Sequence, residues 1–198
     1  MFVEDAAIVL DELAIIFPLG VESRRREAEL MAKAIARFRG VEFVTLPGVV
    51  EGGDLLRIGR TIYAGLSART NRDGVRQLRA IVSRFGYEVI CVSMTGCLHL
   101  KTAVTSLGNN TLLANREWFD ASAFSGYRWI DVDRAEPHGG NSLLVNGSVI
   151  YPTSFPRTLR RLEADGFRVL PIDISELQKA EAGLTCSSLI FEWDGTSP

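Results

Sequence analysis

A unit that recurs along the chain restricts its fold more than any other feature of the sequence. Four times, a glycine is followed directly by a short run rich in apolar and β-branched or aromatic residues. These glycines, Gly40, Gly86, Gly126 and Gly166, are separated by 46, 40 and 40 positions. Glycine is typical of the position that ends a helix, and the residues after each one alternate as a strand does. The sequence therefore predicts four similar units in succession.

A helical pattern precedes most of these glycines. Residues 24–36 and 71–84 carry apolar side chains at helical spacing, whereas the third unit shows only a short, weak helical pattern near Trp118. Serines stand where capping residues would begin the helices of three units, namely Ser23, Ser67 and Ser154. We therefore expect one helix in each unit, capped by serine in the first, second and fourth.

Two short apolar runs split by a turn precede each helix. Examples are residues 6–10 with 13–17, 55–58 with 62–66, and 143–145 with 148–151. Asn146-Gly147 between the last two runs is a strong signal for a two-residue hairpin. Each unit is thus predicted to be strand–strand–helix–strand.

About half of a fifth unit follows the fourth, because residues 175–179 predict a short helix and residues 186–191 a strand. Similar units joined without linkers predict one α/β domain whose repeats pack around a common axis. The domain is placed at residues 1–198. Its repeats are placed at residues 2–46, 47–92, 98–132, 140–172 and, for the partial unit, 173–192.

Charge and composition exclude several classes of protein. The chain of 198 residues has 22 Lys and Arg against 24 Asp and Glu, a net charge of −2 that argues against a nucleic-acid or anionic-membrane partner. No apolar run approaches the roughly 18 residues of a membrane span, and Glu4 and Asp5 stand where a signal peptide would need positive charge. The three cysteines, at no metal-ligand spacing, favour free thiols and a cytoplasmic location.

Polar residues precede the first strand of each predicted unit, at the end that would lie near the axis. They are Glu4-Asp5, Glu51-Gly52-Gly53-Asp54, His99-Leu100-Lys101, His138-Gly139-Gly140-Asn141 and, in the partial unit, Thr185-Cys186-Ser187-Ser188. Equivalent positions around one axis would bring a thiol, an imidazole and several carboxylates together. These are the components of a nucleophilic site.

Six segments in a fixed order resemble the dimethylarginine dimethylaminohydrolases, a family of the guanidino-group-modifying (pentein) superfamily. They are Phe2-Val3-Glu4-Asp5, Ser23-Arg24-Arg25, Glu51-Gly52-Gly53-Asp54, Leu66-Ser67-Ala68-Arg69-Thr70-Asn71, Leu98-His99-Leu100-Lys101 and Leu184-Thr185-Cys186. The resemblance extends from Phe2 to about Phe191. It implies a five-fold pseudosymmetric α/β-propeller of ββαβ units, of which about four and a half lie in this chain.

The resemblance also implies a reaction, the hydrolysis of N-methylated arginine to citrulline and a methylamine. A guanidinium carbon is a poor electrophile, and a cysteine thiolate is the side chain best suited to attack it. By resemblance Cys186 is that nucleophile and forms a covalent thiouronium. His99 protonates the leaving amine and then activates water, and Glu51 holds the tautomer of His99.

Substrate binding is assigned by the same resemblance to Phe2, Glu4, Asp5, Arg24, Arg69 and Ala180. Carboxylates suit the in-plane N–H donors of a guanidinium group, and arginine forks suit the α-carboxylate of the substrate. The expected partner is a small guanidino compound, and a homodimer is compatible with that. Without metal-ligand spacing or a phosphate-binding glycine motif, we expect no metal and no cofactor.

Four residues near these motifs have no assigned function: three are interpreted as structural, and the role of the fourth is undecided. Cys91 and Cys97 match no motif of the family and are interpreted as packing residues. His138 matches no catalytic position and is interpreted as structural. Asp54 stays open between a structural role and a place in the pocket.

Other functions compete with hydrolysis of methylarginine. Family members carry a strand–helix–strand segment before the position of Phe2, with an acidic residue and a loop that covers the substrate. We therefore expect an N-terminally truncated member, and an inactive truncated chain is one alternative. An arginine deiminase-like hydrolase of another guanidino compound is a second, because tolerance for methyl groups lies partly in that segment. A non-catalytic ribosome-binding factor shares the propeller but would not need the cysteine, histidine and glutamate.

Overall fold

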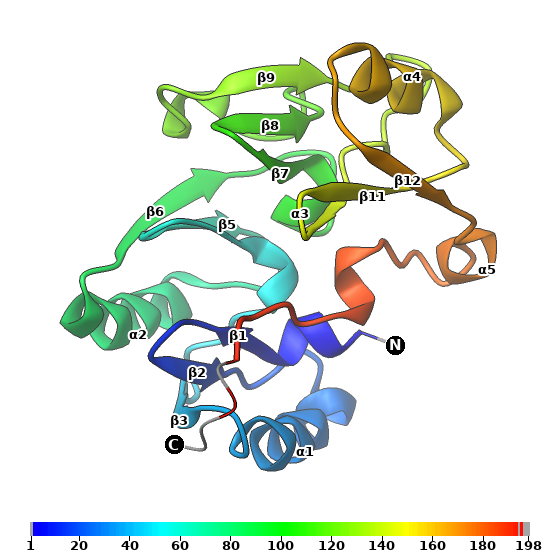
Figure 1. Ribbon diagram of the computed structural model, residues 1–198. Helices are drawn as coiled ribbons and strands as arrows, with labels where there is room; N and C mark the ends of the chain where they lie inside the picture. Colours follow the sequence, from blue (N-terminus) through cyan, green and yellow to red (C-terminus); the bar gives the residue numbers. More distant parts are fainter. Residues whose placement is uncertain (1, 194, 196–198) are drawn as a thin grey trace.

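Four three-stranded sheets follow one another in the computed structural model, which describes residues 2–193 and 195 (Figure 1). In every sheet the first two strands form an antiparallel hairpin, and the third strand lies parallel to the second. A parallel pair needs a crossover connection, and the helix or turn of each unit supplies it. The predicted α/β fold of ββαβ units is therefore confirmed, with four complete units.

The bounds of the elements follow the chain in this order. The first unit contains η1 (Val3–Ala6), β1 (Ala7–Val9), β2 (Leu13–Ile16), η2 (Glu22–Arg24), α1 (Arg25–Ile35) and β3 (Gly40–Phe43). The second contains η3 (Gly52–Asp54), β4 (Leu55–Ile58), β5 (Thr61–Leu66), α2 (Arg72–Val82), η4 (Ser83–Phe85) and β6 (Glu88–Ser93). The third contains α3 (Leu100–Ala103), β7 (Val104–Gly108), β8 (Thr111–Ala114), η5 (Ala121–Ala123) and β9 (Arg128–Asp131). The fourth contains β10 (Leu143–Val145), β11 (Ser148–Pro152), α4 (Pro156–Ala164) and β12 (Val169–Ile172), and α5 (Ser175–Gln178) and η6 (Thr185–Ser187) follow it.

A single helical turn stands directly before the first strand of each of the first three units, as η1, η3 and α3. These turns contact one another, and η6 contacts η1. Figure 1 shows the units arranged around a common centre, with the orange and red segment of α5 and η6 beside the N-terminus. The turns therefore bring the polar residues of the predicted axis together.

The apolar core lies mainly between consecutive units. One cluster joins the first two units through residues such as Ile15 and Leu78, a second joins the second and third, and a third joins the third and fourth. Hairpin β10–β11 turns at Asn146 and Gly147 with φ of 48° and 72°, which confirms the predicted two-residue hairpin. Of the helices in residues 2–193, none has the length and apolar character to cross a membrane.

The structure corrects several sequence-based expectations about helix ends. The residues that precede α1, α2 and α4 are Arg24, Asn71 and Phe155, so the predicted serine caps are wrong. Asn71 caps α2 by accepting a hydrogen bond from the Gly74 N–H at 2.8 Å. Gly86, Gly126 and Gly166 have the left-handed φ that is typical of a helix or turn end. Gly40, in contrast, is the first residue of β3. The third unit contains only the short turn η5 where a weak helix was expected.

The strand predicted at residues 186–191 is also wrong. Cys186 lies within η6, and the residues after it continue outside any sheet. Leu189 and Phe191 instead pack against Val9 and the apolar cluster around it. Long-range hydrogen bonds to Glu4 and Asn141 hold Thr185, the first residue of η6. The prediction of one domain spanning residues 1–198 stays a prediction, and residues 1, 194 and 196–198 lie outside the described residues.

Candidate active site

A cavity of about 800 Å³ lies where the turns meet. All nine residues predicted for catalysis and substrate binding line it, although they come from segments far apart in the chain. They are Phe2, Glu4, Asp5, Arg24, Glu51, Arg69, His99, Ala180 and Cys186. The structure thus brings the whole predicted set to one cavity of a size typical for small-molecule sites.

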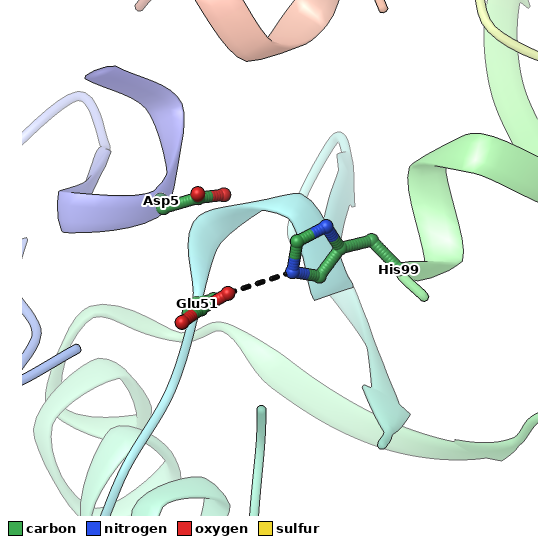
Figure 2. Close-up of side chains that lie close together, drawn as sticks. All are labelled: Asp5, Glu51 and His99. Atoms are coloured by element: carbon green, nitrogen blue, oxygen red, sulfur yellow. Dashed lines mark hydrogen bonds and ion pairs between the residues drawn. The ribbon is translucent and has the colours of Figure 1, made fainter. Parts of the chain in front are cut away.

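His99 and Glu51 form a hydrogen-bonded pair in this cavity. The Nε2 atom of His99 lies 2.8 Å from Oε2 of Glu51, and Figure 2 shows the two side chains meeting from different turns, with Asp5 beside them. Burial disfavours the imidazolium, but the hydrogen bond to Glu51 and the charges of Asp54 and Asp5 outweigh it and raise the pKa of His99. Burial also opposes ionisation of Glu51, yet the His99 contact and the nearby arginines lower its pKa. The pair therefore favours a charged imidazolium beside a charged carboxylate.

Gly52 and Gly53 are required by the close packing around this pair. A Cβ atom on Gly53 would lie 2.8 Å from Cγ of the His99 ring, and one on Gly52 would lie 2.0 Å from the backbone oxygen of Glu4. Contacts this short exclude any side chain at either position without movement of the neighbours. The two glycines therefore let η3 pack directly against His99 and η1.

Asp5 presents an unpaired oxygen to the site. Its side chain is 3% exposed, and Oδ2 accepts a hydrogen bond from Arg24 at 2.9 Å. The other oxygen, Oδ1, is buried without a hydrogen-bond partner among the described residues. A buried carboxylate oxygen without a donor is unfavourable, so this atom is suited to accept a hydrogen bond from a bound cation.

Arg24 is bound by the protein on several sides. It donates to Glu27 at 2.9 and 2.8 Å and to the Phe2 carbonyl at 3.3 Å, and its guanidinium lies 5.5 Å from the centre of the Phe2 ring. Together with the bond to Asp5, these contacts tie residues 2–5 to the start of α1. Within the described part of the chain, Arg69 forms one ion pair, in which its Nη1 atom lies 3.3 Å from Oε1 of Glu51.

Cys186 lies in the middle of η6, partly buried at the wall of the cavity. The Gly183 N–H donates to its Sγ atom at 3.3 Å. Burial raises the pKa of the Cys186 thiol, and the charges of Glu4 and Asp5 add to that effect against the opposite influence of Gly183 and Lys101. The isolated protein therefore favours the neutral thiol.

Glu4 is held in a buried network that sequence reasoning did not anticipate. One carboxylate oxygen pairs with the Lys101 ammonium, and the other accepts a hydrogen bond from the Thr185 hydroxyl at 2.8 Å. Asn141 donates in turn to Thr185 Oγ1 at 3.1 Å. Lys101 and Thr185 both belong to segments that resemble the family, and this resemblance could have indicated a role for them. Their contacts with Glu4 could be found only from the three-dimensional structure. Because both oxygens of Glu4 already have donors, its contact with a substrate stays a prediction.

Three residues that the sequence left open or interpreted as structural have definite places. His138 lines the cavity and packs its ring 4.8 Å from that of Trp118. Cys97 also lines the cavity, donates to the His99 carbonyl at 3.4 Å, and burial raises its pKa to about 11. Cys91 is exposed on β6, so its interpretation as a packing residue is wrong.

The ligand atoms of Asp5, Glu51 and His99 lie within 4.8 Å of one another. A divalent cation could be held by such a set. The carboxylate oxygens of Asp5 and Glu51 could instead accept the N–H donors of a flat organic cation, and the bond between His99 and Glu51 already satisfies one atom of each. The expectation of no metal stays a prediction.

Comparison with known proteins places the chain in a family. The family model described as arginine deiminase matches residues 1–142. A dimethylarginine dimethylaminohydrolase from Pseudomonas aeruginosa is 38% identical over 193 residues, which cover 96% of this chain and 76% of that protein. One from Streptomyces coelicolor is 38% identical over 191 residues, covering 96% and 73%.

Solved structures agree with the sequence comparison. A dimethylarginine dimethylaminohydrolase adduct with S-methyl-L-thiocitrulline, in a histidine-to-glycine variant, superposes with a TM-score of 0.91 at 38% identity, covering 96% of this chain and 76% of that one. The Pseudomonas aeruginosa enzyme, as a cysteine-to-serine variant complexed with citrulline, gives 0.88 at 37% identity, covering 96% and 75%. An amidinotransferase at 16% identity shares the fold, with a TM-score of 0.86.

The fold and the site therefore define a protein of the guanidino-group-modifying, or pentein, superfamily. Within it, the chain belongs to the dimethylarginine dimethylaminohydrolase family.

Proposed function

We propose that this chain hydrolyses N-methylated arginine to citrulline and a methylamine. The observation that carries the proposal is the convergence of Cys186, His99, Glu51 and the acidic pair Glu4-Asp5 on one cavity in a chain 38% identical to enzymes named for this reaction. The small guanidino substrate is the only partner that the proposal requires. The proposal includes a cytoplasmic location, and it is compatible with a homodimer without requiring one.

Charge favours a guanidinium ligand. Glu4, Asp5 and Glu51 are buried at the cavity, and Oδ1 of Asp5 has no donor among residues 2–193. A planar cation with several N–H groups can supply that donor, and each charge-assisted hydrogen bond contributes about 1.5–3 kcal/mol. The cation also offsets the negative charges that raise the pKa of Cys186. Substrate binding would therefore promote formation of the thiolate that attacks it.

The proposed reaction uses one nucleophile and one proton carrier. The Cys186 thiolate attacks the guanidinium carbon, and a C–S bond forms. The C–N bond to the methylated nitrogen then breaks as His99, charged as an imidazolium, gives its proton to the departing amine, which leaves a covalent thiouronium. His99, now neutral, takes a proton from water, which attacks the same carbon. The new hydroxyl group gives its proton to the solvent as the C–S bond breaks, so that citrulline is released with its C=O group and Cys186 becomes a thiolate again.

The remaining predicted residues orient the reactants in this proposal. Glu51 holds Nε2 of His99 by a hydrogen bond. The other ring nitrogen, Nδ1, therefore lies on the side of the ring that faces away from Glu51. Arg69 would hold the α-carboxylate, and Arg24 would orient Asp5 through their hydrogen bond. The Ala180 carbonyl would hold the α-amino group, and Phe2 the aliphatic chain. These residues all line the cavity.

Free arginine is the second candidate substrate, because the family model that matches residues 1–142 is described as arginine deiminase. The two substrates differ only in the methyl groups on the leaving nitrogen. We expect the cavity to release citrulline faster from a methylated arginine.

Citrulline release from asymmetric dimethylarginine and from arginine, measured side by side, tests the proposal. Cys186→Ser is expected to abolish turnover, whereas Cys91→Ser, at an exposed position on β6, is expected to leave it intact. Substrate should also protect Cys186 from alkylation. Faster release from arginine would overturn the choice of substrate, and turnover by Cys186→Ser would overturn the mechanism.

A further inference from the structure

Asp54 is a fully buried carboxylate at the end of turn η3, and both of its oxygens accept hydrogen bonds. Oδ1 accepts from the backbone N–H of Leu100 at 3.1 Å. Oδ2 accepts from the hydroxyls of Ser67 at 2.7 Å and Thr70 at 2.6 Å. Burial raises the pKa of Asp54 even against these donors, so holding a carboxylate here is costly.

Each of the three residues that donate to Asp54 is joined directly to a residue of the proposed site, either by the peptide bond or by a hydrogen bond. Leu100 directly follows His99 at the start of α3. The Thr70 hydroxyl accepts a hydrogen bond from the backbone N–H of Glu51 at 3.1 Å. The Ser67 hydroxyl accepts from the backbone N–H of Arg69 at 2.9 Å.

The pattern of donors requires a carboxylate at this position. Each hydroxyl has one proton, and both Ser67 and Thr70 accept a backbone N–H on the oxygen while giving that proton to Asp54. The Leu100 N–H can only donate. An asparagine at position 54 would offer one accepting oxygen and would point an N–H group at a donor. Asp54 therefore accepts at both oxygens, which orients all three partners.

We propose that Asp54 is a positioning residue that fixes His99, Glu51 and Arg69 relative to one another. It acts through Leu100, Thr70 and Ser67 and does not itself touch the substrate. The roles of the three positioned residues rest on the proposed function, but the hydrogen-bonded arrangement does not. In the motif Glu51-Gly52-Gly53-Asp54, the first residue, Glu51, thus belongs to the proposed site, and the last residue, Asp54, positions the residues of that site.

A titration of His99 provides a readout that a merely structural role would not move. The charged groups facing His99 are Glu51 directly before η3, Asp54 at the end of η3, and Asp5 on η1. The chain has only two histidines, so the ring protons of His99 and His138 can be followed separately by NMR. Asp54→Asn removes one of the three charges and the acceptor that orients the start of α3, and should lower the titration midpoint of His99.

The experiment compares Asp54→Asn with a matched control at Glu136, another buried carboxylate, which accepts from the backbone N–H groups of Arg157 and Thr158. For Asp54→Asn we expect kcat for citrulline release to fall at least tenfold and the His99 midpoint to move to lower pH. Glu136→Gln should change neither. Thermal unfolding of each variant separates lost stability from altered function.

If Asp54→Asn fails to fold, Thr70→Val and Thr70→Ser test the same arrangement, because only serine keeps the hydroxyl between Asp54 and Glu51. Thr70→Val should reduce kcat and shift the His99 midpoint, and Thr70→Ser should restore both. A folded Asp54→Asn or Thr70→Val variant with unchanged kcat and unchanged His99 midpoint would overturn the proposal. If the unmodified chain hydrolyses neither substrate, the proposed function fails, and the NMR titration alone decides the role of Asp54.

Discussion

The hydroxyl of Thr185 donates a hydrogen bond of 2.8 Å to the carboxylate of Glu4, joining two turns that lie 181 positions apart in the sequence. The turn that carries Cys186 is thereby attached to the turn that carries Asp5. Asn141 strengthens the link, because it donates to Thr185 Oγ1 and accepts from the Thr185 N–H at 3.3 Å. The geometry of the proposed nucleophile relative to the acidic groups therefore depends on this buried contact.

Replacing Thr185 tests that dependence. Thr185→Val keeps the shape of the side chain but leaves Oε2 of Glu4 without its donor and one N–H of Asn141 without its acceptor. An unsatisfied buried polar group costs about 1–3 kcal/mol, so we expect the unfolding midpoint and kcat both to fall. Thr185→Ser keeps the hydroxyl and should retain most of each. Thr153→Val, at an exposed position after β11, serves as control, and equal behaviour of all three variants would contradict the prediction.

The pKa of Cys186 predicts an unusual pH dependence of its alkylation. Burial and the neighbouring charges of Glu4 and Asp5 raise the pKa of this thiol, so the thiolate forms at higher pH than in an ordinary cysteine. The rate of reaction with iodoacetamide at Cys186, followed by mass spectrometry, should keep rising above about pH 9, where an ordinary thiol is mostly ionised.

Removing one of those charges should shift the profile in a known direction. Asp5→Asn leaves less negative charge beside the sulfur, which favours the thiolate, so the midpoint of the alkylation profile should move to lower pH. Asp73→Asn changes a carboxylate on α2 that pairs with the exposed Arg76 and should leave the profile in place. A shift to higher pH in Asp5→Asn would refute this electrostatic account.

Gly53 is predicted to tolerate no side chain. In Gly53→Ala the new Cβ atom would lie 2.8 Å from Cγ and 2.9 Å from Nδ1 of His99, so the imidazole must move. Since a misplacement of about 1 Å can cost 10²-fold in rate, we expect kcat to fall roughly 10- to 100-fold. Gly40→Ala is the control, because nothing lies within 4 Å of its added Cβ. Equal kcat values for the two variants would show that the ring adapts without loss.

The local parts of the fold could be predicted from the sequence because their signals lie within a few residues. Asn146-Gly147 predicted its hairpin, and the spacing of Gly86, Gly126 and Gly166 revealed the units. The serine caps failed for a tertiary reason. The Ser67 hydroxyl is engaged by Asp54, and the start of α2 is left to Asn71. A local pattern could not show that competition.

The candidate site was predictable to a similar degree. Equivalent positions in successive units indicated which polar residues would converge, and the motifs resembling the family selected among them. The contacts that hold those residues were not predictable, because they join distant segments. Thr185 with Glu4, and Asp54 with Leu100, are pairs of this kind. The turn at Cys186, where a strand was expected, begins at Thr185 and is held by the first of these pairs.

The two arginines of the site, Arg24 and Arg69, are predicted to differ in what they contribute, although the resemblance to the family assigned both to substrate binding. Arg24 donates to Asp5, to Glu27 and to the Phe2 carbonyl, so its loss should disturb residues 2–5 for every substrate. Among the described residues, the side chain of Arg69 makes only the longer contact of 3.3 Å with Glu51, which leaves its other guanidinium N–H groups available for the α-carboxylate.

A pair of substrates with and without that carboxylate separates the two roles. Arg69→Lys loses the bidentate fork, and should reduce kcat/KM for a methylated arginine about 10- to 100-fold, the equivalent of one strong charge-assisted bond. For the corresponding methylated agmatine, which has no carboxylate, the reduction should be much smaller. Arg24→Lys should reduce kcat/KM for both compounds by similar factors, because Asp5 loses its orientation in either complex. The reverse pattern, with selectivity lost in Arg24→Lys and kept in Arg69→Lys, would assign the carboxylate to Arg24.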